Sequence, residues 1–244
     1  MNNPFQMQRE LRYGWPVCDE ILTGRFFTVG YSWYFRQPKW VLEIINRNDN
    51  IAKILEKIDR LDNFRADVRI PKRFRASLDA YAKSGYDRGH LVSSANQINE
   101  AIQNSETFLL SNMSPQKGDL NRFMWKDLES KIRELNDKDD VLETYVLTAP
   151  VFYFKQPIET IGKEDDLGIT VPIPHAFIKS VLAEDCKGKL SLWTFRMDNK
   201  KLTGSVGDYL IKTYDAEQLV GGRFWDRISG HDLHSQKGDF GKMW

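Results

Sequence analysis

The sequence predicts an α+β fold with an antiparallel or mixed sheet. Segments rich in aromatic and β-branched residues, which are typical of strands, recur from the first quarter of the chain to the last. Between them lie stretches in which apolar residues recur every three or four positions, the pattern of an amphipathic helix. The 244 residues can form one full core, and no long Gly/Ser/Pro linker or internal repeat divides them, so we expect a single large domain.

The first elements expected along the chain are two strands and a helix. Residues 26–35 and 39–45 are rich in aromatic and β-branched side chains and are separated by three residues, Arg-Gln-Pro. Over residues 50–61, apolar side chains recur at offsets of three and four, which predicts an amphipathic helix with a solvated polar face.

The second half of the chain is expected to supply the rest of the sheet. Residues 141–152, 168–182 and 189–197 have the composition of strands. Residues 205–228 are predicted to be mostly helical. Strands and helices therefore follow one another without a regular alternation, which favours the α+β class.

The centre of the chain places polar, chemically active side chains inside a predicted strand. Residues 87–92 are Asp-Arg-Gly-His-Leu-Val. The period of two in a strand puts Arg88 and His90 on one face and Asp87 on the other. A cation and a titratable imidazole therefore share a face.

A second strand and a helix are predicted directly afterwards. Residues 107–116 form an apolar run that places Asn112 on the same face as its apolar neighbours. Apolar residues at 120, 124, 128, 132 and 135 then form a helical stripe, with Asp119 as the expected N-cap. At about 100° per residue, Glu129 lies roughly 80° round the helix from Asn121, so an amide and a carboxylate can face one cleft.

Three motifs in this order, "DRGH", "NMSPQ" and "LNR…WKDLE", resemble the DNA/RNA non-specific endonucleases of the ββα-metal type. The resemblance extends over roughly residues 26–228. It implies a ββα-metal fold whose central, mostly antiparallel sheet is flanked by helices. It also implies an N-terminal extension at residues 1–25 and a C-terminal tail at residues 229–244.

The family's functional residues can be carried over onto these motifs one by one. By this resemblance, His90 is the general base and Asn121 is the direct protein ligand of one Mg²⁺ ion, for which Mn²⁺ could substitute. Glu129 and Asn112 correspond to residues that orient the surroundings of the ion and the phosphate, and Arg88 corresponds to a phosphate contact. The implied activity is hydrolysis of phosphodiester bonds in DNA and RNA.

The chemistry of these residue types agrees with that activity. Hydrolysis of a phosphodiester needs a base that activates the nucleophile and a cation that neutralises charge in the transition state. An unperturbed imidazole such as that of His90 is mostly neutral at physiological pH, and Mg²⁺ accepts an amide oxygen such as that of Asn121. Because two-metal sites need several clustered carboxylates and the motifs offer chiefly Glu129, we expect a single ion.

Each functional interpretation has a structural alternative. His90 could be a core histidine bonded to a backbone carbonyl, and Asn112 could be only an Asx-turn that closes its strand. Asp87 is expected to fix a neighbouring loop or strand rather than to contact the metal. His175 is expected to be structural, and the pair His231 and His234 is assigned no role.

The charge distribution points to an anionic partner only locally. Lys and Arg total 35 and Asp and Glu total 34, so the net charge of +1 excludes a globally cationic protein. Six cations nevertheless lie between residues 60 and 75. We interpret Arg65, Arg69 and Arg73, together with Arg88, as contacts to DNA or RNA phosphates, although a charge run can also be a solvated surface.

The sequence gives only indirect information about the cellular compartment and about membrane binding. The two cysteines, Cys18 and Cys186, allow at most one disulfide and favour a reducing compartment. The N-terminus lacks the pattern of a signal peptide, and no apolar stretch is long enough to span a bilayer. We expect a cytoplasmic protein without a membrane partner, with a matured secreted or periplasmic form as the alternative.

Two features depart from the family's pattern. Phe123 stands where a glycine is expected and could narrow the cleft or stack on a base. The tail matches no pattern and could be a lid, a dimer contact or a junction. The sequence also leaves open a homodimer, an inhibitor or regulatory partner, a partner-gated nuclease effector, and a catalytically silent nucleic-acid-binding module.

Overall fold

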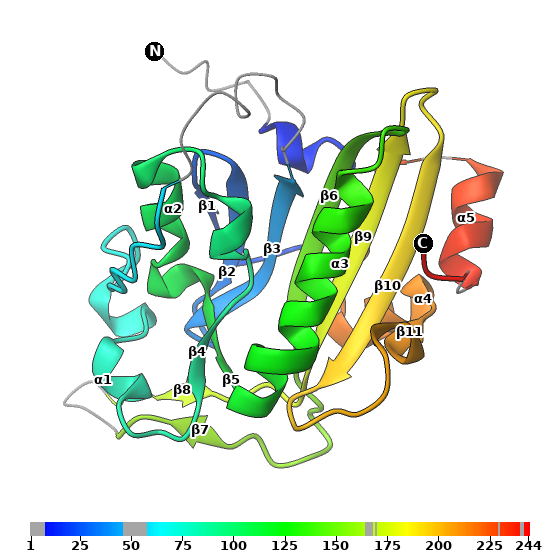
Figure 1. The fold of residues 1–244 in the computed structure, drawn as a ribbon. Helices are drawn as coiled ribbons and strands as arrows, with labels where there is room; N and C mark the ends of the chain where they lie inside the picture. Colours follow the sequence, from blue (N-terminus) through cyan, green and yellow to red (C-terminus); the bar gives the residue numbers. More distant parts are fainter. Residues whose placement is uncertain (1–7, 46–57, 164–167, 169, 229, 240–241) are drawn as a thin grey trace.

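The fold is built on one antiparallel sheet of seven strands, shown at the centre of Figure 1. The computed structural model describes residues 8–45, 58–163, 168, 170–228, 230–239 and 242–244. The order across the sheet is β1 (Glu20–Thr23), β2 (Phe27–Ser32), β3 (Gln37–Ile45), β6 (Val141–Val151), β9 (Ala176–Asp185), β10 (Leu190–Asp198) and β11 (Leu210–Ile211). Every neighbouring pair is antiparallel, so the predicted α+β class with a mostly antiparallel sheet is confirmed.

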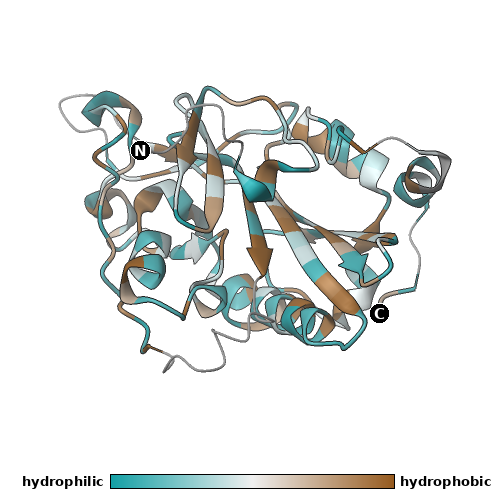
Figure 2. Cartoon of the chain, turned by 90° about the horizontal axis from the view of Figure 1, so that it is seen from above, coloured by the Kyte–Doolittle hydropathy of each residue, from teal (hydrophilic) through white to brown (hydrophobic). Residues whose placement is uncertain are grey.

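Both faces of this sheet are covered, as the view from above in Figure 2 shows. On one face, Val146 belongs to the same apolar cluster as residues of helix α3 (Lys126–Asn136). On the other, the adjacent Tyr145 belongs to a cluster with residues of α4 (Thr213–Val220) and α5 (His231–Gly238). Because both faces are buried, β6 has a nearly continuous apolar sequence rather than an alternating one.

Short elements connect these layers. They are η1 (Arg9–Leu11), η2 (Lys72–Phe74), α1 (Leu78–Tyr81), η3 (Ser94–Asn96), α2 (Ala101–Thr107), η4 (Leu110–Asn112), β7 (Thr160–Ile161), β8 (Val171–Pro172) and η6 (Val206–Tyr209). None of the helices in the described part of the chain is long and apolar enough to cross a membrane.

The ends of the chain take part in the packing. β1, inside the segment expected as an N-terminal extension, pairs with β2 at the edge of the sheet. At the other end, α5 packs against β10 and α4. The indole of Trp244 packs edge-on against Trp193 and Phe195, and its Nε1 donates to the carbonyl of Lys131 in α3 at 3.0 Å.

Most predicted strands are present, with one difference in the centre of the chain. The run expected as a strand over 107–116 is a strand only from Met113, because η4 precedes it. The chain turns at η4 because its polar side chains are satisfied there. Ser111 Oγ donates to Asp67, and Asn112 Nδ2 donates to the carbonyl of Thr107. A straight strand would not bring these partners together.

The segment predicted to be mostly helical, 205–228, is broken into η6, β11 and α4. Ser205 and Asp208 form a capping box that closes η6 into a short turn. At the other end, Gly221 adopts a left-handed conformation with φ of 67° and ends α4. Of the helix predicted over 50–61, residues 50–57 lie outside the described residues, and residues 58–61 are not helical.

Candidate active site

The three central motifs lie on one face of the sheet, where β4 and β5 lie beside α3 in Figure 1. β4 (Asp87–His90) pairs antiparallel with β5 (Met113–Gln116), and His90 is opposite Met113. The helix that follows begins with a π-helical segment, η5 (Leu120–Trp125), and continues as α3. The predicted cap at Asp119 is wrong: Asp119 already has helical dihedrals, and its side chain makes no capping hydrogen bond.

Gly89 allows this pair of strands to close. A Cβ atom at Gly89 would lie 2.4 Å from Oε1 and 2.6 Å from Cβ of Gln116. Any side chain at position 89 would therefore force β4 away from β5. The glycine of the "DRGH" motif sets the distance between the strand that carries His90 and the strand that leads to the helix.

The imidazole of His90 is held between two phenyl rings. The centroids of Phe64 and Phe108 lie 5.5 and 4.9 Å from that of His90, both edge to face. Burial, reinforced by the nearby charge of Arg60, lowers the pKa of His90 to about 3, although a backbone hydrogen bond at Arg88 raises it slightly. The ring is therefore neutral at physiological pH. Its buried Nε2 atom has no hydrogen-bond partner among the described residues.

Asn121 is oriented by Asp87. Asn121 Nδ2 donates to Asp87 Oδ2 at 3.0 Å, and Arg122 donates to both oxygens of Asp87 at 2.9 and 2.6 Å. Burial alone would raise the pKa of Asp87, but the hydrogen bonds from Arg122 and Asn121 outweigh it and hold that pKa below its ordinary value. Because Nδ2 of Asn121 is engaged, its Oδ1 atom remains available as a ligand.

Glu129 interacts with buried charged side chains that the sequence analysis does not predict. Burial raises the pKa of Glu129, and the charge of Lys179 and a hydrogen bond from Ser93 partly oppose that rise. Lys179 on β9 is only 1% exposed, and its Nζ donates to Thr148 Oγ1 at 2.9 Å and to the carbonyl of Leu91 at 3.4 Å. Its ammonium also lies 4.6 Å from the centroid of the Trp125 ring.

A second buried carboxylate, Glu43 on β3, completes that group. Its oxygens accept hydrogen bonds from Asn96 Nδ2 at 3.1 Å and Gln97 Nε2 at 3.3 Å. Burial raises the pKa of Glu43 to about 7, although the charge of Lys179 lowers it. Buried charges are costly unless they are paired and hydrogen-bonded, and each of these has such partners.

Asn112 does not face the solvent. Its side chain is fully buried, with Oδ1 accepting from the Val92 amide at 2.9 Å and Nδ2 donating to the carbonyls of Val92 and Thr107. All its polar atoms are thus engaged within the chain. The side chain therefore does not form the Asx-turn considered as the alternative, and it instead fixes the segment that follows His90.

A pocket of about 690 Å³ opens at Asp87 and Asn121, and neither His90 nor Glu129 is among its lining residues. Its lining residues include Asp87, Arg88, Asn121 and Arg60. The guanidinium of Arg88 lies 4.0 Å from the centroid of the Phe64 ring, which leaves an exposed cation over an aromatic face. The structure therefore brings the predicted residues Arg88 and Asn121 together, and it adds Arg60 from the basic segment.

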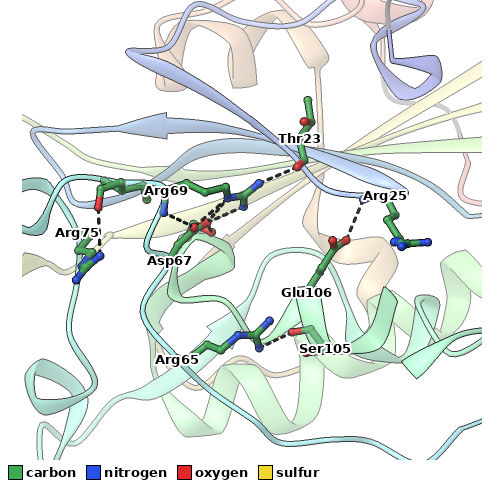
Figure 3. Close-up of polar contacts among 10 residues, drawn as sticks. Thr23, Arg25, Arg65, Asp67, Arg69, Arg75, Ser105 and Glu106 are labelled. Atoms are coloured by element: carbon green, nitrogen blue, oxygen red, sulfur yellow. Dashed lines mark hydrogen bonds and ion pairs between the residues drawn. The ribbon is translucent and has the colours of Figure 1, made fainter. Parts of the chain in front are cut away.

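The other predicted phosphate contacts are not among the residues that line this pocket. Figure 3 shows the polar contacts of Arg65 and Arg69. Arg69 donates to both carboxylate oxygens of Asp67 and to the carbonyl of Thr23. Arg65 donates to the carbonyl of Ser105 at 2.9 Å. Arg73 lies 5.0 Å from the ring of Phe74. Much of the basic segment therefore stabilises local structure.

His175 and His234 contact groups within the chain. His175 Nδ1 accepts from the Tyr153 amide at 3.2 Å, and its Nε2 lies 3.2 Å from the carbonyl of Pro157, in keeping with the structural role expected for it. His234 Nδ1 is 2.8 Å from the hydroxyl of Tyr214. Within the described ranges, no group of three His, Cys, Asp or Glu side chains could hold a metal ion.

The donor atoms present do fit a hard, oxygen-preferring cation. Asn121 offers a neutral amide oxygen whose orientation Asp87 fixes, and Glu129 offers a carboxylate on the same helix. Mg²⁺ keeps several waters and binds through few protein atoms plus substrate phosphate, so it does not need a cage of side chains. Zinc, which prefers nitrogen and sulfur ligands, would fit poorly.

Comparison with known proteins agrees with the motifs. The model of a family described as DNA/RNA non-specific endonuclease matches residues 10–230. The chain is 31% identical over 244 residues to mitochondrial endonuclease G of Caenorhabditis elegans, covering 96% of this chain and 77% of that protein. It is 32% identical over 227 residues to a nuclease of Syncephalastrum racemosum, covering 87% of this chain and 69% of that protein.

A solved structure is similar along nearly the whole chain. It is a crystal structure of the EndoG/EndoGI complex, described as showing a mechanism of EndoG inhibition. The TM-score is 0.79 at 28% sequence identity, and the alignment covers 90% of this chain and 91% of that one.

Proposed function

The chain belongs to the DNA/RNA non-specific endonuclease family, and from that premise we propose that it is a Mg²⁺-dependent endonuclease that cuts DNA and RNA with little sequence preference. It is a nuclease, hence a phosphodiester hydrolase, of a metal-dependent family. The observation that carries the proposal is the hydrogen bond from Asn121 to Asp87. That bond leaves an amide oxygen available in a pocket that Arg88 also lines.

His90 is the proposed general base. Its neutral ring has a nitrogen that no described residue engages, and Phe64 and Phe108 hold the ring in place. His90 accepts a proton from water while the water oxygen bonds to phosphorus and one ester P–O bond breaks. Arg88 and Arg60 hold the anionic phosphodiester in the pocket.

Asn121 would be the direct protein ligand of the single Mg²⁺ ion, with Mn²⁺ as an alternative, and Glu129 would orient water molecules bound to the ion. When bound, the ion supplies positive charge that stabilises the phosphorane-like transition state and the departing oxygen. Asp87 engages the amide nitrogen of Asn121, which leaves the amide oxygen for the ion. Asn112 holds the backbone after His90 through both polar groups of Val92.

Weak selectivity is expected because the pocket recognises what DNA and RNA share. The cations that line it can pair with any phosphate and carry no information about bases. Among the described residues we identify no helix-turn-helix or zinc finger that would enter a groove. No side chain of the pocket is evidently dedicated to a 2′-hydroxyl.

Nucleic acids are the proposed substrates, and two kinds of protein partner extend the proposal. The first is an inhibitor or gating partner, because the similar solved structure is a complex that describes inhibition of EndoG. The second is another copy of this chain, in a homodimer. Some relatives are named as mitochondrial proteins, whereas a cytoplasmic location stays a prediction for this chain.

The test is incubation of plasmid, circular single-stranded DNA and structured RNA with Mg²⁺, with Mn²⁺ and with EDTA. We expect either ion to support cleavage of all three substrates, and EDTA to prevent it. The cleaved ends should have many different sequences. A single recurrent cleavage motif, or digestion confined to free ends, would overturn the proposal. Binding without cleavage would instead support the silent module, and cleavage only with an added partner would support the gated effector.

A further inference from the structure

Phe123 is an exposed aromatic residue in the helix that carries the proposed metal ligand. Its side chain is 68% exposed, whereas Leu120 and Trp125 of the same segment are buried. Among the described residues it stacks on no other ring, so packing within the chain does not explain the phenyl group. The ring is therefore free to contact a ligand, and the residues around it determine which ligand fits.

An open hollow of about 450 Å³ surrounds this ring. It is lined by Arg122, Phe123, Met124, Lys126, Asp127 and Ser130. The hollow therefore combines one aromatic face with two cations and a single carboxylate. This combination matches a nucleotide, which presents a flat base beside an anionic phosphate.

Arg122 connects the hollow to the proposed active site. Its guanidinium is held by Asp87, which also holds Asn121, and Arg122 itself lines the hollow. At about 100° per residue, Phe123 lies roughly 160° round the helix from Asn121, and Arg122 lies between them on one side. A strand whose phosphate binds at Asn121 would therefore have to pass round the helix over Arg122 to reach Phe123.

We propose that Phe123 is a stacking platform for an unpaired nucleobase of the substrate strand, with Lys126 and Arg122 contacting the neighbouring phosphates. This subsite rests on the proposed nuclease function and deepens it by selecting for single-stranded segments. In a duplex both faces of an internal base are covered by its neighbours, so only an unpaired base can stack on the ring. Stacking accepts every base, which agrees with weak sequence preference.

The experiment measures binding without catalysis. A labelled oligo(dT) and a blunt duplex of the same length are titrated in EDTA, by fluorescence anisotropy, with the wild type and with Phe123→Ala, Phe123→Leu and Phe123→Trp. We expect Phe123→Ala and Phe123→Leu to weaken binding of the single strand by about tenfold and to leave duplex affinity unchanged. Phe123→Trp should bind the single strand as tightly as the wild type does. The matched control is Phe154→Ala, because Phe154 is 74% exposed and lines neither the hollow nor the pocket.

The outcomes separate this inference from the proposed function. Single-strand binding that is equal in Phe123→Ala and wild type, or a loss that is equal for single strand and duplex, overturns the stacking platform. If plasmid is still cut by these variants with Mg²⁺, the nuclease proposal survives that result. If the wild type neither binds oligo(dT) nor cuts plasmid, the proposed function fails, and the stacking platform with it.

Discussion

Removal of the Asp87 carboxylate should change the metal requirement of the enzyme more than its stability. In the structure, one oxygen of Asp87 accepts from Asn121 Nδ2 at 3.0 Å. Without that acceptor, the amide of Asn121 can rotate, and its nitrogen can face the pocket as readily as its oxygen. An amide nitrogen cannot coordinate Mg²⁺, so Asp87→Ala should weaken metal binding.

The size of the effect can be worked from the two sets of hydrogen bonds that Asp87 makes. Partners that orient a metal ligand typically contribute 10- to 100-fold to metal affinity, or about 1.4–2.7 kcal/mol, which is close to the value of one hydrogen bond to a charged group. The bonds to Arg122 contribute little to folding, because the side chain of Arg122 is 68% exposed and solvent screens an ion pair at the surface. We therefore expect a shift of 10- to 100-fold in the Mg²⁺ needed for half-maximal rate, with a loss of stability of about 1 kcal/mol.

Initial rates of plasmid cleavage over a Mg²⁺ series, beside chemical denaturation of each variant, measure both quantities. Asp87→Asn keeps one acceptor oxygen and should recover part of the affinity. Asp79→Ala removes another carboxylate that lines the same pocket without a hydrogen bond to Asn121, so its Mg²⁺ curve should stay close to that of the wild type. An unchanged curve for Asp87→Ala, or an equal shift for Asp79→Ala, would refute the orienting role.

Three other substitutions test the rest of the site. His90→Ala should lower turnover by about 10²–10⁴ while affinity for DNA in EDTA persists, and an equal loss of both, or unfolding detected by circular dichroism, would indicate a structural histidine. Asn112→Ala leaves three buried backbone groups unpaired and should cost about 3 kcal/mol or more of unfolding free energy; a loss below 1 kcal/mol would contradict that bonding. Burial raises the pKa of Glu43 to about 7, so the folded state binds its proton more tightly than the unfolded chain, and the resulting stability is lost as pH rises from about 4.5 to 7. Relative to Glu43→Gln, the wild type should therefore lose about 3 kcal/mol over that range in denaturant unfolding, and parallel stability curves would refute the shift.

The strands and the central helix could be predicted because their signals are local. Residues 141–152 and 189–197 have the composition of strands, and the structure places β6 and β10 there. The helical stripe that starts at Leu120 is likewise buried, at Leu128 and Ile132 among others. Periodicity reports which face of an element is buried, and burial is what these elements have in common.

The role of Asp87 could not be predicted in the same way. Its partners, Asn121 and Arg122, lie 34 and 35 positions away, and strand alternation says only that Asp87 and His90 face opposite sides. The sequence predicts that Asp87 fixes a neighbouring segment, and the structure shows such hydrogen bonds, but the sequence does not identify Asn121 and Arg122 as the donors. Tertiary geometry decides that partner, and no spacing in the sequence encodes it.

In the basic segment, residues 60–75, the sequence does contain a local sign of internal pairing. The number of cations nevertheless favours the interpretation as phosphate contacts. Asp67 precedes Arg69 by two residues, and the two form a salt bridge at 2.6 Å. Hydrogen bonds from Arg69 and Ser111 hold the pKa of Asp67 below its ordinary value even though burial opposes this. A charge run that contains its own counter-ions is weaker evidence for a phosphate groove than its net charge suggests.

Lys179 shows why the site depends on the register of the distant sheet. It lies in an apolar strand, and lysine is rarely fully buried, so the sequence alone favours an exposed side chain. Instead its ammonium bonds the carbonyl of Leu91, directly after His90, and lies against the ring of Trp125, between Asn121 and Glu129. The two segments that carry the proposed base and metal ligands therefore meet on one side chain of β9. A shift of β9 by one residue against β6 would turn Lys179 to the opposite face and leave Glu43 and Glu129 without their cation, so the geometry of the site requires the long-range pairing of the central strands.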